Sequence, residues 1–183
     1  LSIWLARQDI TVEETYKLAG DSSAITHAHP RSRLACFYHA SLVYYLVDNS
    51  PNVLDAVVEA LRDLKTLRDE RPDLREDAEI VIRAVREAMG RGPRQGPGCR
   101  ADGYVVNSLQ ASLWAVLNSS SYKQAVLAAV NLGDDTDTTG AIVGGLAGLI
   151  WGIEGIPSRW RSQIARNEDI TRATEEFLAS IER

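Results

Sequence analysis

Residues 133–140 read Gly133-Asp134-Asp135-Thr136-Asp137-Thr138-Thr139-Gly140, and the apolar segment 141–153 follows without a break. Glycines recur every four residues from Gly140 to Gly152, a spacing that places them along one side of a helix. Glycine in a helix interior costs about 0.8–1.0 kcal/mol relative to alanine, so we expect another backbone to approach this side closely. The stretch therefore predicts a polar loop followed by the central, most buried helix of the fold.

The rest of the chain has the same helical periodicity. Apolar residues recur three or four positions apart, and no convincing run alternates strictly between apolar and polar residues. Thr11 and Ser121, each followed three residues later by Glu or Gln, mark helix starts, and Ser50 followed by Pro51 marks another. We expect helices over residues 11–24, 31–47, 51–64, 72–90, 104–118, 121–133, 141–151 and 171–182, with a short one after Pro157. The chain is thus predicted to be all-α.

Composition narrows the classes of function. The 183 residues carry a formal net charge of -5, which disfavours a nucleic-acid partner because gripping phosphate backbones needs a positive surface. The apolar segment 141–153 is shorter than the roughly 20 residues that cross a bilayer, so we expect no membrane span. Cys36 and Cys99 are the only cysteines and do not form a disulfide framework, which predicts a reducing, cytoplasmic setting.

Three carboxylates lie within four positions at residues 134–137, and this cluster is the strongest candidate for chemistry. Such groups repel one another, so a structure that gathers them normally offers a cation, hydrogen-bond donors or bulk water. Carboxylate and hydroxyl oxygens favour Mg²⁺, Mn²⁺ or Ca²⁺ over Zn²⁺, and a helix that begins near Asp137 would add its dipole. The plainer alternative is that Asp134 or Asp135 is a helix N-cap in a solvated loop. For the cluster as a whole we favour a metal site.

Two other motif interpretations compete for the same residues. An EF-hand calcium loop starting at Asp135 fails, because its twelfth position is Leu146 where a bidentate Glu is required. Residues 135–139 also resemble the DxDxT motif of haloacid-dehalogenase-type phosphatases, whose nucleophilic Asp ends a buried strand. Here the preceding segment is helical and no Lys follows Asp137, so the phosphatase is the less favoured alternative.

Segments 25–32, 103–114, 125–138 and 141–157, in that order, resemble the ADP-ribosylglycohydrolase family. Its members include dinitrogenase reductase-activating glycohydrolases and hydrolases of ADP-ribosylated arginine and serine. The resemblance implies an all-α, orthogonally packed domain with two Mg²⁺ ions, or Mn²⁺, beneath an ADP-ribose cleft. It also implies hydrolysis at ribose C1″ that releases ADP-ribose from ADP-ribosylated proteins or small substrates. A non-catalytic, crystallin-like or binding member of the same family is the alternative.

Carried over by position, the family's Gly-Gly-Asp-Thr-Asp-Thr metal motif falls on residues 133–138. The resemblance implies that Asp135, Asp137 and Thr138 ligate metal and that the two aspartates are also catalytic. Asp134 stands where the family has its second glycine, so we do not assign it as a ligand.

The same resemblance places His27 at the substrate cleft, and Gly103 and Tyr104 among the contacts to ADP-ribose. His27 and His29 alone would suggest Zn²⁺, but the sequence offers no third nitrogen or sulfur ligand in reach, so a polar role at a helix end is the alternative.

Family members begin with a glycine-rich segment that holds a Glu, followed by a Thr-Asp-Asp motif, and neither precedes His27 here. We therefore expect residues 1–183 to be the C-terminal portion of a single domain whose N-terminal helices are missing. The rest would come from a missing segment or a complementary chain, and this portion alone would be inactive.

Overall fold

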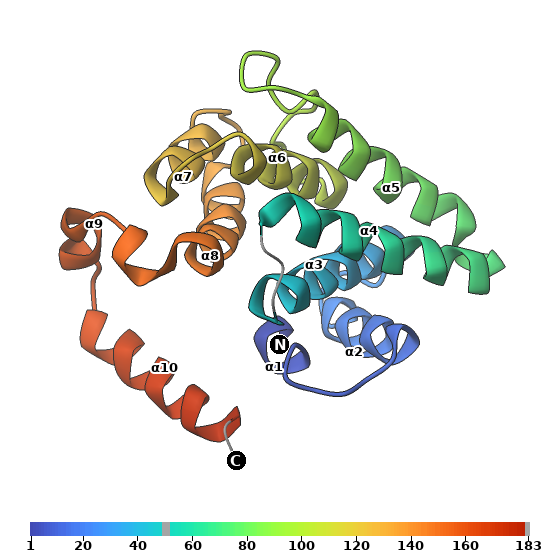
Figure 1. Ribbon diagram of the computed structural model, residues 1–183, viewed down its shortest axis with the longest axis horizontal. Helices are drawn as coiled ribbons and strands as arrows, with labels where there is room; N and C mark the ends of the chain where they lie inside the picture. The colour runs from blue at the N-terminus through green and yellow to red at the C-terminus, as the bar shows by residue number, and fades with distance from the viewer. Residues whose placement is uncertain (49–51, 182–183) are drawn as a thin grey trace.

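The computed structural model describes residues 1–48 and 52–181, and within these ranges every regular element is a helix. The all-α prediction is therefore confirmed. In chain order the elements are α1 (Ser2–Leu5), α2 (Val12–Ala24), α3 (Pro30–Asp48), α4 (Val53–Glu70), η1 (Pro72–Leu74), α5 (Arg75–Gly90), α6 (Val105–Leu117), α7 (Tyr122–Val130), α8 (Thr136–Gly155), α9 (Ser158–Gln163) and α10 (Asn167–Ile181). Figure 1 shows α9 and α10 extending away from the cluster formed by the earlier helices.

Helices α3 and α6 form the centre of the fold. Helix α3 packs against α1, α2, α4, α5, α6 and α8, while α6 lies between α5 and α8 and also contacts α7. Almost all of α6, from Val106 to Val116, is buried. Helix α8 buries Thr139, Val143, Leu146 and Ala147 and leaves much of its length exposed. The prediction that α8 is the central, most buried helix is wrong, because its apolar run is diluted by glycines that add no side-chain area to a core.

The glycine side of α8 also differs from the prediction of a close backbone approach. A Cβ at Gly140 would meet the Val130 side chain at 3.1 Å, and one at Gly144 would meet the Tyr122 hydroxyl at 3.2 Å. A Cβ at Gly148 would meet nothing within 4 Å. Side chains of α7, rather than another backbone, therefore cover the first half of this side. Gly152 has φ +68° and interrupts the helical geometry.

Local capping explains where several helices begin. The Thr11 hydroxyl accepts from the Glu14 N–H, and the Thr11 N–H donates to the Glu14 carboxylate, so the predicted capping box is confirmed. The Ser121 hydroxyl likewise caps α7. The predicted start at Ser50 and Pro51 lies outside the described residues, and α4 is instead capped by Asn52. The predicted end of the last helix at Glu182 is outside them too.

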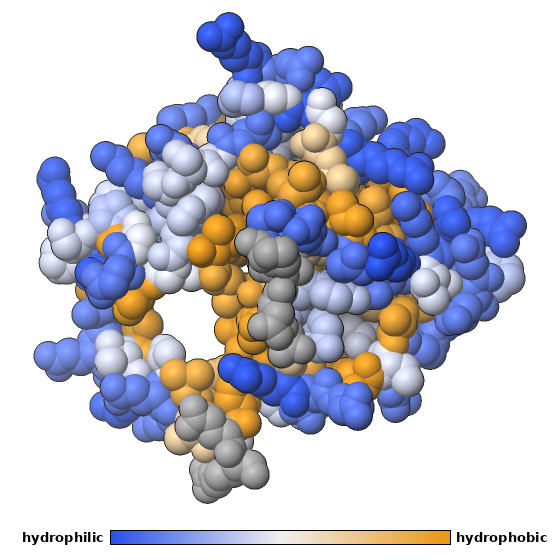
Figure 2. Space-filling model, in the orientation of Figure 1, coloured by the Kyte–Doolittle hydropathy of each residue, from blue (hydrophilic) through white to orange (hydrophobic). Residues whose placement is uncertain are grey.

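Helix α10 has an apolar stripe but buries none of its described residues. In Figure 2 apolar surface gathers around the opening between α10 and the rest of the molecule. The exposed large apolar side chains of this C-terminal part are Ile153, Ile164, Ile170, Phe177 and Leu178.

Among the helices of the described ranges, none combines the length and the apolar character that crossing a membrane requires.

Candidate active site

One cleft, with a volume of about 700 Å³, brings together segments that are far apart in the sequence. It is lined by α1, the end of α2, the first half of α3, the residues before and within α6, and the start of α8. His27, Gly103, Tyr104 and Thr138 all line it. Four of the six residues that the sequence singled out thus share one cavity.

The remaining two, Asp135 and Asp137, lie at the start of α8. This helix begins at Thr136, five residues before the predicted start at residue 141, so the second half of the polar stretch belongs to the helix. Asp135 occupies the N-cap position, but its side chain makes no capping hydrogen bond, and Thr139 bonds its backbone carbonyl instead. The pKa of the Asp137 carboxyl is lowered, chiefly by the neighbouring Asp135 carboxyl and then by the backbone N–H groups of residues 137 and 138. The capping alternative thus holds for the position of Asp135 in the backbone, and its side chain is not used as a cap.

The loop before α6 lies directly against Asp135. The Asp135 N–H donates to the Ala101 carbonyl at 2.8 Å. Gly103 has φ +79°, and a Cβ at this position would lie 2.8 Å from Asp135 Oδ2. Asp102 holds the loop by accepting from the Tyr104 N–H and from the Asn107 amide. The predicted substrate-contact loop and the predicted metal ligand are thus in direct contact.

Asp134, where the family motif has glycine, has a backbone φ of 55°. This is the left-handed region that favours glycine and that Asp tolerates better than most residues. Its carboxylate forms an exposed ion pair with Arg100 at 3.1 Å. Asp134 therefore has the backbone conformation that glycine favours, and its negative charge is paired with Arg100.

Three histidines line the cleft. His27, just after α2, is exposed, and its Nδ1 lies 2.9 Å from the Thr26 hydroxyl. His29 accepts from the Arg31 N–H at 3.2 Å. His39 lies deeper, 3.4 Å from the Ser2 hydroxyl, and burial lowers its pKa, so it is neutral at physiological pH. The sequence analysis assigned no role to His39.

Arg31 is a cleft residue that the sequence analysis missed. Its Nε donates to Asp77 Oδ1 at 2.7 Å, and its Nη1 donates to the Tyr104 hydroxyl at 3.2 Å. The available signal was its place within segment 25–32, which carries part of the family resemblance, and at the start of the predicted helix 31–47.

The donor set at the start of α8 suits a hard cation in chemical type. It comprises the carboxylates of Asp135 and Asp137 and the hydroxyl of Thr138, all oxygen donors of the kind that Mg²⁺ prefers. Within residues 1–48 and 52–181, no three His, Cys, Asp or Glu side chains are grouped as metal ligands would be.

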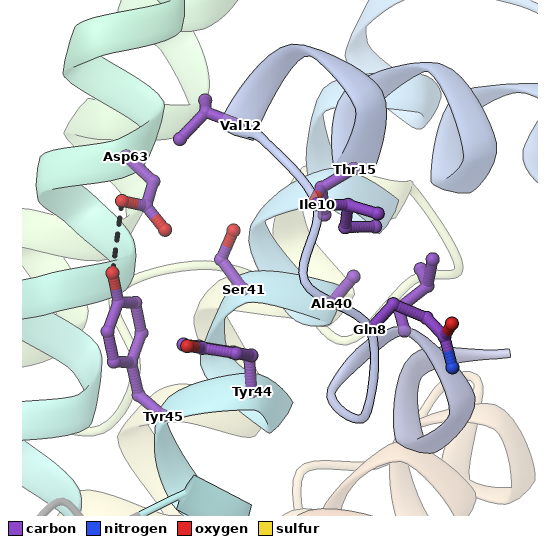
Figure 3. Close-up of a pocket in the computed structure, with 10 residues that line it drawn as sticks. Gln8, Ile10, Val12, Thr15, Ala40, Ser41, Tyr44, Tyr45 and Asp63 are labelled. Carbon is purple, nitrogen blue, oxygen red and sulfur yellow. Dashed lines mark hydrogen bonds between the residues drawn. The ribbon is translucent and has the colours of Figure 1, made fainter. Parts of the chain in front are cut away.

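A second, smaller cavity of about 170 Å³ lies among α2, α3 and α4 and contains none of the predicted site residues. Figure 3 shows the Tyr45 hydroxyl pointing to Asp63, to which it donates at 3.1 Å. Burial raises the pKa of Asp63, with hydrogen bonds from Tyr45 and Ser41 opposing the shift. This polar contact connects α3 to α4.

Comparison with known proteins identifies the class to which this cleft belongs. The model of the ADP-ribosylglycohydrolase family matches residues 1–183, and the chain belongs to that family. The fold agrees, since a solved structure described as an ADP-ribosylglycohydrolase-related protein complex aligns with a TM-score of 0.65 at 26% identity. That alignment covers 84% of this chain and 49% of the solved one.

Curated relatives share the family. The chain is 27% identical over 175 residues to the ADP-ribosylarginine hydrolase Tri1 of Serratia proteamaculans. This alignment covers 92% of the present chain and 42% of the relative. The ADP-ribosylarginine hydrolase Tri1 of Pseudomonas putida is 43% identical over 79 residues, an alignment that covers 43% of this chain and 21% of the relative. The ADP-ribosyl-[dinitrogen reductase] glycohydrolase of Rhodospirillum rubrum is 29% identical over 157 residues, covering 85% and 46%. The chain spans less than half the length of these relatives.

Proposed function

We propose that this chain contributes the cleft and part of the metal site of an enzyme that hydrolyses ADP-ribose from modified substrates. The observation that carries the proposal is the convergence of His27, Gly103, Tyr104 and Thr138 on one cleft, with Asp135 packed against Gly103. Family membership supports the same activity. The substrate would be an ADP-ribosylated protein or a small ADP-ribose compound, as the names of the relatives indicate.

The residues of the chain have distinct tasks in this reaction. Asp135, Asp137 and Thr138 would hold Mg²⁺, which when bound supplies Lewis-acid charge beside the distal ribose. The ring of Tyr104 offers an aromatic face for the nucleotide, and His27 offers a ring nitrogen to the ribose or phosphate groups. Asp135 or Asp137 would accept a proton from the attacking water as the water oxygen bonds to C1″ and the bond between C1″ and the acceptor breaks, and that proton would then pass to the departing acceptor. ADP-ribose and the unmodified acceptor are released.

The chain matches only part of each relative, and this indicates where the remaining residues of the proposed metal site would come from. Because the chain matches less than half of each relative, we propose that it forms the C-terminal portion of a single domain. The remaining metal ligands would then come from a segment equivalent to the unmatched part of the relatives. The two cysteines, Cys36 and Cys99, are both free thiols, which is compatible with the reducing, cytoplasmic setting included in this proposal.

The helices around the motif disfavour the phosphatase alternative, whereas the fold does not distinguish the enzyme from a non-catalytic family member. A DxDxT phosphatase places its nucleophile at the tip of a strand, whereas the described ranges contain helices α7 and α8 on either side of the motif and no strand. A non-catalytic family member would have the same fold and the same cleft, so only an activity measurement separates it from the enzyme.

The test uses the protein expressed from its own gene. Release of ADP-ribose from an ADP-ribosylated substrate is followed while Mg²⁺ is titrated, in the wild type, Asp137→Asn and Asp134→Asn. An amide is a much weaker ligand for a hard cation than a carboxylate, so Asp137→Asn should lower kcat by roughly 10²–10⁴-fold. Both aspartates are exposed, so both variants should fold, and Asp134→Asn should retain activity.

Two results would contradict the proposal. A wild-type protein that binds ADP-ribose without releasing it from any modified substrate would favour the non-catalytic member. An Asp137→Asn variant with wild-type activity and Mg²⁺ response would refute the metal assignment.

A further inference from the structure

The charge of the cleft differs from that of the chain as a whole. The chain has a formal net charge of -5, but none of the described residues that line the cleft is an Asp or Glu. Among the same residues Arg31 is the only Arg or Lys. Arg31 is therefore the one permanently cationic side chain on the described lining, and its counter-charge, Asp77, lies outside that lining.

The guanidinium of Arg31 is anchored on one edge. Its Nε donates to Asp77 of α5 at 2.7 Å, and its Nη1 donates to the Tyr104 hydroxyl at 3.2 Å. The Arg31 and Asp77 side chains are 32% and 21% exposed, so the pair is partly screened from solvent. In the hydrogen bonds of the described residues, Nη2 of Arg31 has no partner.

This arrangement leaves donors ready for a ligand. A guanidinium has five N–H groups in one plane, and two of its nitrogens are engaged by Asp77 and Tyr104. The remaining N–H groups have the geometry that binds phosphate oxygens, with shorter and stronger hydrogen bonds than those between neutral groups. Because Asp77 already holds the side chain, less side-chain entropy is lost when a ligand binds.

The contact with Tyr104 links this charge to the predicted nucleotide contact. Tyr104 is exposed at the cleft, and its hydroxyl is held by Arg31, so the orientation of its ring depends on the same side chain. An ADP-ribose group carries two phosphates between its two ribose units. The same group ends in an adenine ring. Arg31 beside the Tyr104 ring therefore offers a cation for the phosphates and an aromatic face for the adenine within one cleft.

We propose that Arg31 binds the diphosphate of the ADP-ribose group and that Asp77 is a positioning residue that holds the Arg31 guanidinium toward the cleft. This inference rests on the proposed function and names the residue that recognises the anionic part of its substrate. The alternative is a purely structural ion pair between α3 and α5, which would affect stability and leave ligand discrimination unchanged.

The experiment measures equilibrium binding of two probes, ADP-ribose and adenosine, to the protein expressed from its own gene, at two salt concentrations. Arg31→Gln should weaken ADP-ribose binding about tenfold or more and change adenosine binding by less than about twofold, because adenosine has no phosphates. The salt dependence of ADP-ribose binding should also decrease. Asp77→Asn should weaken ADP-ribose binding in the same direction and to a smaller extent.

Arg33→Gln is the matched control. Arg33 lies two residues further along α3, pairs with Asp21 and does not line the cleft. It should leave the affinities for both probes unchanged. If Arg31→Gln does not fold, Arg31→Lys provides a second reading. Lysine keeps the charge but has no planar group that can contact Asp77, Tyr104 and a phosphate together, so ADP-ribose binding should still weaken.

The outcomes separate this inference from the proposed function. Tight ADP-ribose binding by both the wild type and Arg31→Gln would overturn the role of Arg31 and leave the proposed function standing. Equal weakening of both probes would show a structural role and overturn the inference. A wild type that binds ADP-ribose through Arg31 but hydrolyses nothing would support the inference and refute the enzymatic function. Absence of ADP-ribose binding by the wild type would overturn both.

Discussion

The carboxylate of Asp135 occupies the space that any side chain at position 103 would need, since a Cβ on Gly103 would lie 2.8 Å from Asp135 Oδ2. The neighbouring backbone strengthens this contact, because the Asp135 N–H donates to the Ala101 carbonyl. The loop before α6, which lines the cleft, and the start of α8 are therefore positioned by each other. A substitution in the loop should therefore also displace the start of α8.

Gly103→Ala should consequently impair the site as well as the fold. A non-glycine residue in the left-handed region costs about 1–2 kcal/mol, and the new methyl group would also displace the Asp135 carboxylate. We expect a lower melting temperature together with a weakened Mg²⁺ response and reduced activity. Thermal melts and Mg²⁺ titrations of the same samples measure both effects.

Gly96→Ala is the control for Gly103→Ala. Gly96 also has a positive φ, of 65°, but a Cβ there would meet nothing within 4 Å. It should lower the melting temperature by a similar amount without altering the Mg²⁺ response. Equal effects of the two variants on metal response would show that the contact between Gly103 and Asp135 has no bearing on the site.

His27→Ala should raise the KM for an ADP-ribosylated substrate about three- to tenfold, the range expected for losing one hydrogen bond to the ligand. The ring is exposed and bonds only the adjacent Thr26 hydroxyl, so the melting temperature should change little. Steady-state kinetics measure the change in KM, and thermal melts of the same samples measure any change in stability. A loss of stability with unchanged kinetics would assign His27 a structural role at the end of α2.

Ala147→Leu should destabilise the protein more than Gly144→Leu. Ala147 is completely buried, so the larger side chain overpacks the core at a cost of about 1–3 kcal/mol. At Gly144 a Cβ would lie 3.2 Å from the Tyr122 hydroxyl, which is the end of a side chain that can shift, and helix propensity gains about 1 kcal/mol. The glycine spacing alone predicted a close backbone approach on this side of the helix, which would make Gly144→Leu strongly destabilising. Thermal melts of the two variants test it, and a lower melting temperature for Gly144→Leu would restore the original prediction.

Asp63→Asn should stabilise the protein at neutral pH. Because burial raises the pKa of Asp63 in the folded state, the folded protein holds this proton more tightly than the unfolded chain does. Ionisation of Asp63 therefore opposes folding. The penalty is absent below the unfolded pKa and complete above the folded one. Asparagine has no charge, and its carbonyl still accepts from Tyr45, so the melting temperature should rise about 1–2 °C at pH 7.

This gain from Asp63→Asn should shrink as the pH falls toward about 4, where the wild-type carboxyl becomes protonated in both states. Melting curves between pH 4 and 8 provide the measurement. Asp9→Asn is the control and should show no such trend, because Asp9 is exposed, although its neighbours Gln8 and Ile10 line the same small cavity as Asp63. A gain that is independent of pH would exclude desolvation of Asp63 as its cause.

The amino-acid sequence by itself determined the helical character of the chain and most helix boundaries. Apolar spacing and local caps, such as Thr11 with Glu14, act within a few residues, so they can be read without knowing the tertiary structure. The ordered motifs likewise indicated the family, and they singled out residues from His27 to Thr138 that the fold brings to one cleft.

Only the tertiary structure decided which helix is central and which side chains meet across it. The glycines of α8 showed that side chains were absent along one side, but whether a backbone, Tyr122 or open space lay opposite depended on how α7 packs. Arg31 acquired its place in the cleft through Asp77 and Tyr104, partners 46 and 73 residues away. Contacts over such separations follow from the packing of whole helices, and local sequence patterns do not encode them.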